Sequence, residues 1–233
     1  MKFCIIPARG GSKRIPRKNI KVFSGKPMIA YSIETAIKSA CFDRIIVSTD
    51  DQEIAAIAKE YGAEVPFIRP EELADDHTGT LPVVKQAIEW FEQNNEAPSE
   101  VCCLYATAPF TRPQSIQQAN QQLHDTNADY CFTATSFPFP IQRAIKLTKE
   151  NRVKMFQPEY FTARSQDLEE AFHDAGQFYW GKTEAFTAMK PLFSEDSSPY
   201  LLPRYLVQDI DTTEDWIRAE LMYSFLIETG ELQ

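Results

Sequence analysis

Strand-like and helix-like patterns alternate through the first two-thirds of the chain, and this alternation limits the fold more than any other feature of the sequence. Short apolar runs typical of buried strands occupy residues 3–8, 45–49, 65–68, 101–105 and 130–135. Between them, apolar side chains recur at helical spacing over residues 29–37, 54–61, 81–91 and 116–123, and Thr80 is placed to cap the third of these helices. Repeated strand–helix units form parallel sheets with helices on both faces. We therefore expect an α/β protein with a Rossmann-like, mostly parallel sheet, which binds ligands at the carboxyl ends of its strands.

The alternation stops after Ser136, where prolines and short mixed segments follow until a strand pattern returns at residues 177–180. We interpret residues 137–175 as an excursion from the sheet, whose hairpins cover the site or pair with a second copy of the chain. Another strand pattern at 205–210 leads into a closing helix at 214–227, which starts with a Thr212-x-x-Asp215 capping box. No linker or repeat divides the sequence, so residues 1–233 are expected to form one domain.

Charge is distributed unevenly along the sequence. The 233 residues carry 24 Lys or Arg against 33 Asp or Glu, yet residues 1–33 contain eight basic side chains and no acidic one. An acidic protein with one basic segment is suited to binding a small polyanion at one point and poorly suited to nucleic acid. No apolar stretch is long enough to span a bilayer, and no secretory signal is recognisable. Five cysteines without C-x-x-C spacing favour reduced thiols in a cytoplasmic protein.

The first basic segment follows the first strand directly and reads Pro7-Ala8-Arg9-Gly10-Gly11-Ser12-Lys13-Arg14-Ile15-Pro16-Arg17-Lys18-Asn19. Two glycines allow backbone N–H groups to surround an anion, and the basic side chains and Ser12 add charge and a hydroxyl. The spacing matches neither a Walker loop nor a G-x-G-x-x-G loop. Because ligands bind at strand ends in such sheets, a phosphate site is favoured over a solvated basic turn.

A second candidate is Asp209-Ile210-Asp211, at the end of the strand expected at 205–210. Alternation along a strand puts both carboxylates on one face. Two hard oxygen ligands suit Mg²⁺, which takes one or two carboxylates plus substrate phosphates and water. The alternative is that Asp211 only starts the last helix.

Together these segments resemble the CMP-sugar acid synthetases, cytidylyltransferases that activate sialic-type sugars and Kdo. The basic loop is similar to that family's PARxGSKxxPxKN signature. Residues 41–50 resemble its second-strand block, Arg69-Pro70-x-x-Leu73-Ala74-x-Asp76 its third block, and Asp209-Ile210-Asp211 its metal pair. The resemblance spans essentially the whole chain. It implies a homodimer that uses Mg²⁺ to convert CTP and a free 2-keto sugar acid into the CMP-sugar and pyrophosphate.

Two departures refine this resemblance. Residues 104–110 stand where sialic acid enzymes have QPTSPLR, and residues 173–180 stand where they have a PNG-containing strand entry. Both variants resemble the pseudaminic acid branch of the family, which implies a nine-carbon nonulosonic acid as the acceptor. The alternatives within the family are N-acetylneuraminic and legionaminic acid. Outside it, the alternatives are a sugar-1-phosphate nucleotidyltransferase and a non-catalytic nucleotide-binding protein.

The resemblance also implies residue roles. The triphosphate would be held by Arg9, Gly10, Gly11, Ser12, Lys13 and Lys18, and the cytidine by Asn19, Arg69, Asp76 and Thr80. The sugar acid would contact Tyr105, Arg164, Gln177 and Tyr179, with Arg112 and Arg143 as rival partners for its carboxylate. Asp209 and Asp211 would hold Mg²⁺. The expected reaction is in-line attack of the anomeric 2-hydroxyl on the α-phosphate, with Arg9 and Lys18 neutralising charge. Either Asp211 or a metal-bound hydroxide would be the base.

Overall fold

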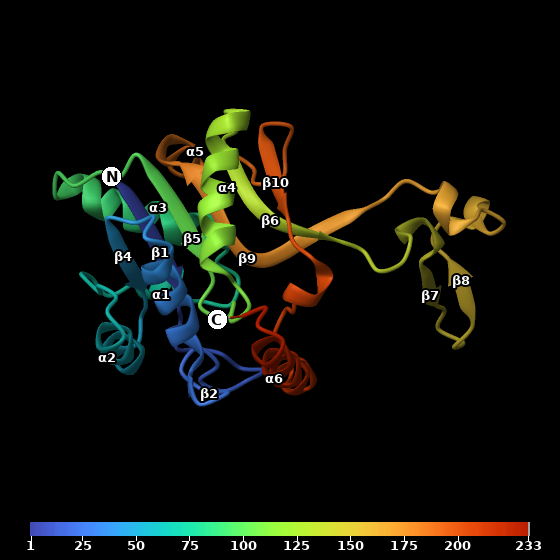
Figure 1. The fold of residues 1–233 in the computed structure, drawn as a ribbon, viewed down its shortest axis with the longest axis horizontal. Coiled ribbons are helices and arrows are strands. Elements are labelled where there is room, and N and C mark those ends of the chain that lie inside the picture. The colour runs from blue at the N-terminus through green and yellow to red at the C-terminus, as the bar shows by residue number, and fades with distance from the viewer. Residues whose placement is uncertain (233) are drawn as a thin grey trace.

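The computed structural model describes residues 1–232, which are built around a six-stranded sheet (Figure 1). The strand order is β10-β6-β9-β5-β1-β4. β1 (Lys2–Pro7) pairs in parallel with β4 (Arg44–Ser48) and β5 (Glu100–Leu104), and β6 (Tyr130–Ser136) pairs in parallel with β10 (Ser197–Leu201). Only β9 (Phe172–Lys182) runs antiparallel to its neighbours, β5 and β6. The expectation of an α/β fold with a mostly parallel sheet is confirmed.

Helices cover both faces of this sheet, because its strands present apolar side chains alternately to each side. On one face, Cys102 and Leu104 share a core with α1 (Met28–Ser39), α2 (Gln52–Glu60) and α4 (Pro113–Thr126). On the other, Val101 and Cys103 share a core with α3 (Thr80–Gln93) and α5 (Thr183–Thr187). No helix among residues 1–232 is long and apolar enough to cross a membrane.

The closing helix α6 (Thr213–Glu228) belongs to a separate apolar cluster. It packs beside the small hairpin of β2 (Val22–Phe23) and β3 (Lys26–Pro27), where the rings of Trp216 and Phe23 meet edge to face with centroids 5.4 Å apart. The capping box of Thr212 and Asp215 is confirmed: each side chain bonds the backbone N–H of the other residue. The capping box therefore fixes the first turn of α6, which begins two residues after Asp211.

Two strand predictions are wrong. Residues 65–68 form no strand: only one bridge joins Glu64 to Ile46, because Pro66 has no N–H to donate to a continuing ladder. Residues 205–210 form no strand either. Arg204–Leu206 is a short 3-10 turn, η5, and residues 207–212 form the loop that precedes α6.

The strand of the six-stranded sheet that was not predicted is β10, whose pattern is interrupted by Pro199. β10 lies at an edge of the sheet, where a proline is tolerated because one side of the strand has no partner. The expected cap of α3 is also one residue off: Gly79 is the N-cap, and Thr80 is the first helical residue.

The excursion leaves the sheet after β6 and extends away from it as a separate arm (Figure 1). It contains the antiparallel pair β7 (Ile145–Leu147) and β8 (Val153–Met155), flanked by the short turns η2 (Ile141–Arg143), η3 (Pro158–Tyr160) and η4 (Ser165–Asp167). β9 already begins at Phe172, so the arm covers residues 137–171 and ends four residues before the predicted boundary at 175.

Candidate active site

The basic loop after β1 is shaped by carboxylates from the loop after β4. The Gly10 N–H donates to Asp50 Oδ1 at 2.9 Å, and Asn19 Nδ2 closes the loop by donating to the Arg9 carbonyl at 2.9 Å. A Cβ atom on Gly10 would come within 2.7 Å of Asp51 Oδ2, so this approach requires glycine. Asp51 also caps α2 and pairs with Arg17, which lowers the pKa of its carboxyl to about 2. The loop is therefore held against the next strand–helix unit.

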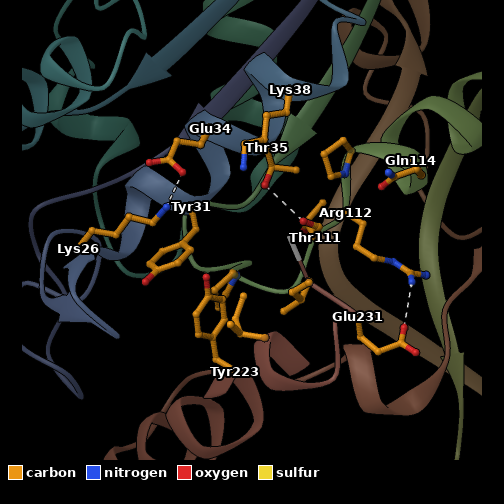
Figure 2. Close-up of a pocket in the computed structure, with 15 residues that line it drawn as sticks. Lys26, Tyr31, Glu34, Thr35, Lys38, Thr111, Arg112, Gln114, Tyr223 and Glu231 are labelled. Atoms are coloured by element: carbon orange, nitrogen blue, oxygen red, sulfur yellow. Dashed lines mark hydrogen bonds and ion pairs between the residues drawn. The ribbon is translucent and has the colours of Figure 1, made fainter. Parts of the chain in front are cut away.

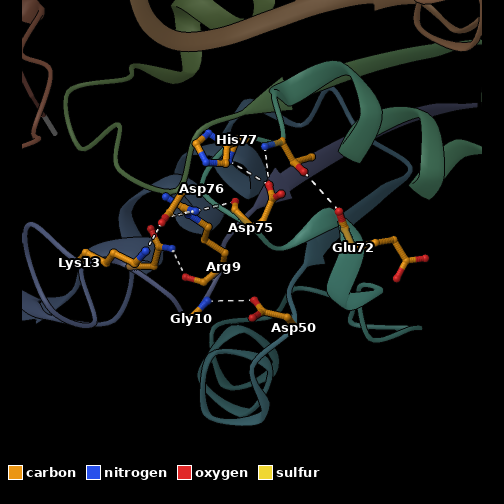
Figure 3. A network of polar contacts seen from close by, with 10 residues as sticks. Arg9, Gly10, Lys13, Asp50, Glu72, Asp75, Asp76 and His77 are labelled. Carbon is orange, nitrogen blue, oxygen red and sulfur yellow. Dashed lines mark hydrogen bonds and ion pairs between the residues drawn. The ribbon is translucent and has the colours of Figure 1, made fainter.

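The loop's cations are gathered by two further carboxylates. Arg9 donates to Asp76 Oδ1 at 2.7 Å and to the Asp75 carbonyl at 2.6 Å, and Lys13 pairs with the other oxygen of Asp76 (Figure 3). The hydrogen bond from Lys13, and to a smaller extent the one from Arg9, lowers the pKa of the Asp76 carboxyl.

The second carboxylate is Asp211, at the far end of the chain. Arg14 NH1 lies 2.9 Å from Asp211 Oδ2, and Lys18 Nζ lies 3.3 Å from Oδ1 while donating to the Ile210 carbonyl at 2.6 Å. Arg9, Lys13, Arg14 and Lys18 thus share only two carboxylates, Asp76 and Asp211. The excess positive charge suits a polyanion.

A cavity of about 410 Å³ opens at this point. Most of the predicted nucleotide-binding residues line it, namely Arg9, Ser12, Lys18, Asn19, Arg69, Asp76 and Thr80. Tyr105 and Asp211, which were predicted for other roles, line it as well. Sequence reasoning missed Arg14, Thr78, Gly79 and Thr107, which also line it. Arg14 could have been found from its position inside the basic loop. Thr107 carries no signal of its own and is brought there by the end of β5. We call this space the nucleotide cavity.

Arg69 supplies a fixed cation at the wall of the nucleotide cavity. Its side chain is buried, and its Nε donates to Ser48 Oγ at 3.1 Å while NH2 bonds the Ser48 carbonyl. Burial lowers the pKa of the guanidinium to about 10, still well above neutral pH. Because it makes no ion pair within residues 1–232, its charge is available to a ligand.

A second cavity, of about 750 Å³, adjoins the first. Tyr105 lines both, Asp211 lines the nucleotide cavity and Asp209 lines the second one. Tyr105 Oη and Thr80 Oγ1 are hydrogen-bonded at 2.6 Å, so the shared wall is fixed from the nucleotide side. We call the larger space the acceptor cavity. Asp209 and Asp211 lie where the two cavities meet.

The acceptor cavity owes its shape to an irregularity in β9. The register with β6 shifts between Phe132 and Ala134, and Gly176 takes a φ of 61°, which is left-handed backbone that favours glycine. The bulge presents Asp174 to the cavity, where Tyr179 donates its hydroxyl to one carboxylate oxygen and the Gly176 N–H donates to the other at 2.9 Å. Burial raises the pKa of both Tyr105 and Tyr179, which keeps their phenols neutral.

Of the residues predicted to face the sugar acid, the structure brings Tyr105 and Tyr179 to the acceptor cavity but not Gln177 or Arg164. Gln177 is buried, donates its Nε2 to the Leu206 carbonyl at 2.5 Å and accepts from Thr111 Oγ1 at 3.2 Å. Arg164 is exposed on the arm. The arginines that line the cavity are instead Arg204 and Arg218, which sequence reasoning missed.

The Asp209–Asp211 pair lies in a loop and not on a strand face, yet the two carboxylates interact. Partial desolvation and the charge of Asp211 raise the pKa of Asp209, as expected for two neighbouring carboxylates. No group of three or more His, Cys, Asp or Glu side chains within residues 1–232 could hold a metal by itself. Two carboxylates fit Mg²⁺ because phosphate oxygens and water complete its coordination.

A third cavity, of about 580 Å³, lies between α1, α6 and the start of α4 (Figure 2). Arg112, one of the rival carboxylate partners, lines it 3.6 Å from Glu231, and Lys26 pairs with Glu34. Two of its cations are therefore already neutralised by neighbours. Arg143, the other rival, lies on the arm, 3.4 Å from Ser165 Oγ. Neither rival lines the acceptor cavity.

Solved structures of low sequence identity share the fold. A CMP:2-keto-3-deoxy-manno-octonic acid synthetase complexed with CTP superposes with a TM-score of 0.71 at 16% identity, covering 96% of this chain and 98% of that one. A 4-diphosphocytidyl-2C-methyl-D-erythritol synthase from Anaerococcus prevotii gives a TM-score of 0.61 at 15% identity, with the same coverage.

Sequence comparison gives more similar relatives. The chain is 48% identical over 220 residues to the pseudaminic acid cytidylyltransferase of Campylobacter jejuni serotype O:2, covering 94% of this chain and 95% of that protein. It is 33% identical over 223 residues to the CMP-N,N'-diacetyllegionaminic acid synthase of Legionella pneumophila, covering 93% of each. Residues 3–227 match the family described as cytidylyltransferase. With this match over nearly its whole length and relatives aligned from end to end, the chain belongs to the cytidylyltransferase family of nucleotide-transferring enzymes.

Proposed function

We propose that the protein transfers the cytidylyl group of CTP to a nonulosonic acid, with pseudaminic acid as the preferred acceptor, and releases pyrophosphate. The observation that carries the proposal is the meeting of two cavities, one rich in cations and one larger, at Tyr105 and the Asp209–Asp211 loop. The relative at 48% identity, named for pseudaminic acid, supports the choice of acceptor. The relative named for legionaminic acid, at 33%, makes that sugar the second candidate.

The triphosphate would be bound by the loop side chains that Asp76 and Asp211 now hold. Arg9 and Lys13 can turn from Asp76, and Arg14 and Lys18 from Asp211, because the side chains of all these pairs are at least partly exposed to solvent. Exchanging a shared carboxylate for phosphate oxygens gives each cation a charge-assisted hydrogen bond. The same exchange frees the carboxylate of Asp211.

The transfer itself takes place where the cavities meet. The acceptor's anomeric hydroxyl oxygen forms a bond to the α-phosphorus, the bond from that phosphorus to the pyrophosphate oxygen breaks, and the hydroxyl proton passes to Asp211. Lys18, fixed by the Ile210 carbonyl, and Arg9 neutralise charge on the phosphates. Mg²⁺ bound by Asp209 and Asp211 would make the phosphorus more electrophilic and balance the charge of the leaving group.

The test is a pyrophosphate-release assay in which the purified protein is offered CTP with pseudaminic, legionaminic and N-acetylneuraminic acids and with Kdo. Release is expected to be fastest with pseudaminic acid and to disappear when UTP, ATP or GTP replaces CTP. A matched series of sugar 1-phosphates serves as the control for the other class of nucleotidyltransferase. Faster release with any sugar 1-phosphate than with the sugar acids would refute the proposal.

We also propose that the protein works as a homodimer joined through the arm. Large apolar side chains on the arm are exposed, among them Phe139 at 79% and Phe161 at 73%. Large exposed apolar side chains gathered on one segment are typical of interfaces, and isologous dimers are the commonest assembly of soluble proteins. Such a dimer would also bring arm residues such as Arg164 to the partner's acceptor cavity.

A dimer at micromolar concentration is therefore expected in sedimentation velocity. Phe139→Asp combined with Phe161→Asp should shift the protein to monomer, because a charge buried in an apolar interface has no partner. Val22→Asp is the control, since Val22 is 61% exposed but lies on β2. A wild-type monomer with full activity would refute this assembly.

A further inference from the structure

The acceptor cavity contains two cations that nothing in the resemblance assigned. Arg204 and Arg218 are its only Lys or Arg lining residues, and neither forms an ion pair within 4 Å in the part of the chain the structure describes. We propose that Arg204 and Arg218 bind the carboxylate of the sugar acid and thereby direct its anomeric end toward the nucleotide cavity. This inference rests on the proposed function, since it names the residues that recognise the acceptor of that reaction.

Both arginines start from fixed backbone. Arg204 begins η5, a turn closed by the Leu206 N–H on the Pro203 carbonyl at 2.9 Å. Leu206 is buried, and its carbonyl accepts from Gln177. Arg218 lies on α6 between the buried residues Trp216 and Ala219. Both side chains are exposed and therefore extend from fixed backbone at the edge of the cavity.

The acceptor cavity is also lined by the carboxylate of Asp174. Asp174 occupies the β9 bulge and already accepts from Tyr179 and Gly176. A carboxylate placed against Asp174 would be repelled, whereas a sugar hydroxyl or acylamino N–H could donate to it. Charge therefore favours placing the acceptor's carboxylate at the arginines and its hydroxyl or acylamino groups at Asp174.

The chemistry of the acceptor requires the same orientation. In a 2-keto sugar acid the carboxylate carbon is bonded directly to the anomeric carbon that carries the attacking hydroxyl. The group that binds the carboxylate must therefore lie beside the reacting phosphate. Arg204 lies in η5, directly before the loop 207–212 that carries Asp209 and Asp211, and Arg218 lies on the helix that begins two residues after Asp211. Arg204, Arg218 and Asp209 line the same cavity. The rest of the sugar then extends toward His173 and Pro138, which also line the cavity.

The experiment compares Arg204→Gln, Arg218→Gln and the double variant with Arg152→Gln, the same change at an exposed arginine that lines none of the three cavities. Arg164→Gln is measured as well, as the test of the rival carboxylate partner on the arm. Losing a charge-assisted hydrogen bond should raise the KM for pseudaminic acid by about 10- to 100-fold in each single variant. The KM for CTP should stay unchanged, because neither arginine lines the nucleotide cavity. Arg204→Lys keeps the charge and should recover part of the loss.

A second measurement separates recognition of the carboxylate from general damage to the cavity. The wild type should discriminate strongly against an acceptor whose carboxylate is replaced by a carboxamide, and the double variant should treat the two acceptors alike. Calorimetric binding of pseudaminic acid to the CTP-free protein gives the same comparison without turnover. Arginine-dependent binding by an enzyme that releases no pyrophosphate would refute the proposed function and leave this inference standing.

The inference would be overturned by a wild type that is active while both variants keep its KM for the sugar acid. It would also be overturned if Arg164→Gln alone raised that KM, because the carboxylate would then be bound by an arm, either from the same chain or from the partner. An equal fall in turnover with the acid and with the carboxamide in the double variant, relative to the wild type, would also contradict the inference.

Discussion

Replacing Asp211 with asparagine is expected to lower kcat by about 10²- to 10⁴-fold, the range that a positioned acid or base contributes. Asparagine keeps the shape of the side chain but removes its charge and its ability to accept a proton. The fold should survive, because α6 is capped by Thr212 and Asp215 and not by Asp211. The measurement is kcat at saturating CTP, pseudaminic acid and Mg²⁺, with circular dichroism to confirm the fold.

Three comparisons make this result specific. Asp209→Asn removes the neighbouring carboxylate and should lower kcat less than Asp211→Asn does if Asp209 only completes the metal's coordination. Asp125→Asn changes an exposed aspartate on α4 and should leave kcat unchanged. Wild type with excess chelator should be inactive, and Mn²⁺ should restore turnover because it also accepts oxygen ligands. A near-wild-type rate in Asp211→Asn would exclude it as the base, and activity in chelator would exclude the metal.

The nucleotide side of the site could be predicted because its signal is local. Between Arg9 and Asn19 the chain carries glycines, cations and no acid, and this loop directly follows a strand whose apolar run is unmistakable. Loop position follows from the strand, and the anion preference follows from the side chains. The structure places Arg9, Ser12, Arg14, Lys18 and Asn19 of this loop around one cavity.

The acceptor side could not be predicted in the same way because it is assembled from distant segments. Arg204 and Arg218 line the acceptor cavity because Gln177 donates a hydrogen bond to the Leu206 carbonyl, which holds the loop against the β9 bulge. No periodicity in the sequence encodes that contact. The same hydrogen bond accounts for Gln177, whose amide holds the backbone that carries the arginine and the two aspartates instead of facing the acceptor cavity.

Strand assignment failed where a single residue overrode the pattern. Residues 205–210 have the alternation of a strand, yet Pro203 starts a 3-10 turn there. Residues 197–201 lack a clear pattern because of Pro199, yet they form an edge strand. Asp209 and Asp211 reached the junction of the cavities for a reason other than the predicted one. Pairing with Lys18 and Arg14 holds Asp211 there, without any strand geometry.

Gly181→Ala is expected to destabilise the fold by about 3 kcal/mol, the upper end of the cost of overpacking a core. Gly181 lies in β9 between β5 and β6, paired with Val101 and Tyr130. A Cβ atom there would come within 2.6 Å of Tyr130 Cδ1 and 2.7 Å of Phe186 Cε2. Both rings are fully buried and packed edge to face on each other, so neither can move aside without displacing α5. The free energy of unfolding from urea titration measures this cost.

Gly11→Ala is the matched control for the same chemical change. A Cβ atom on Gly11 would meet no heavy atom within 4 Å, and its backbone is not left-handed. Because alanine restricts the unfolded chain more than glycine does, this variant should be unchanged or more stable by about 0.4–1 kcal/mol. If Gly181→Ala proves as stable as Gly11→Ala, then β9 does not pack between Tyr130 and Phe186 as described. Since β9 also carries the bulge that presents Asp174, the geometry of the acceptor cavity would have to be revised with it.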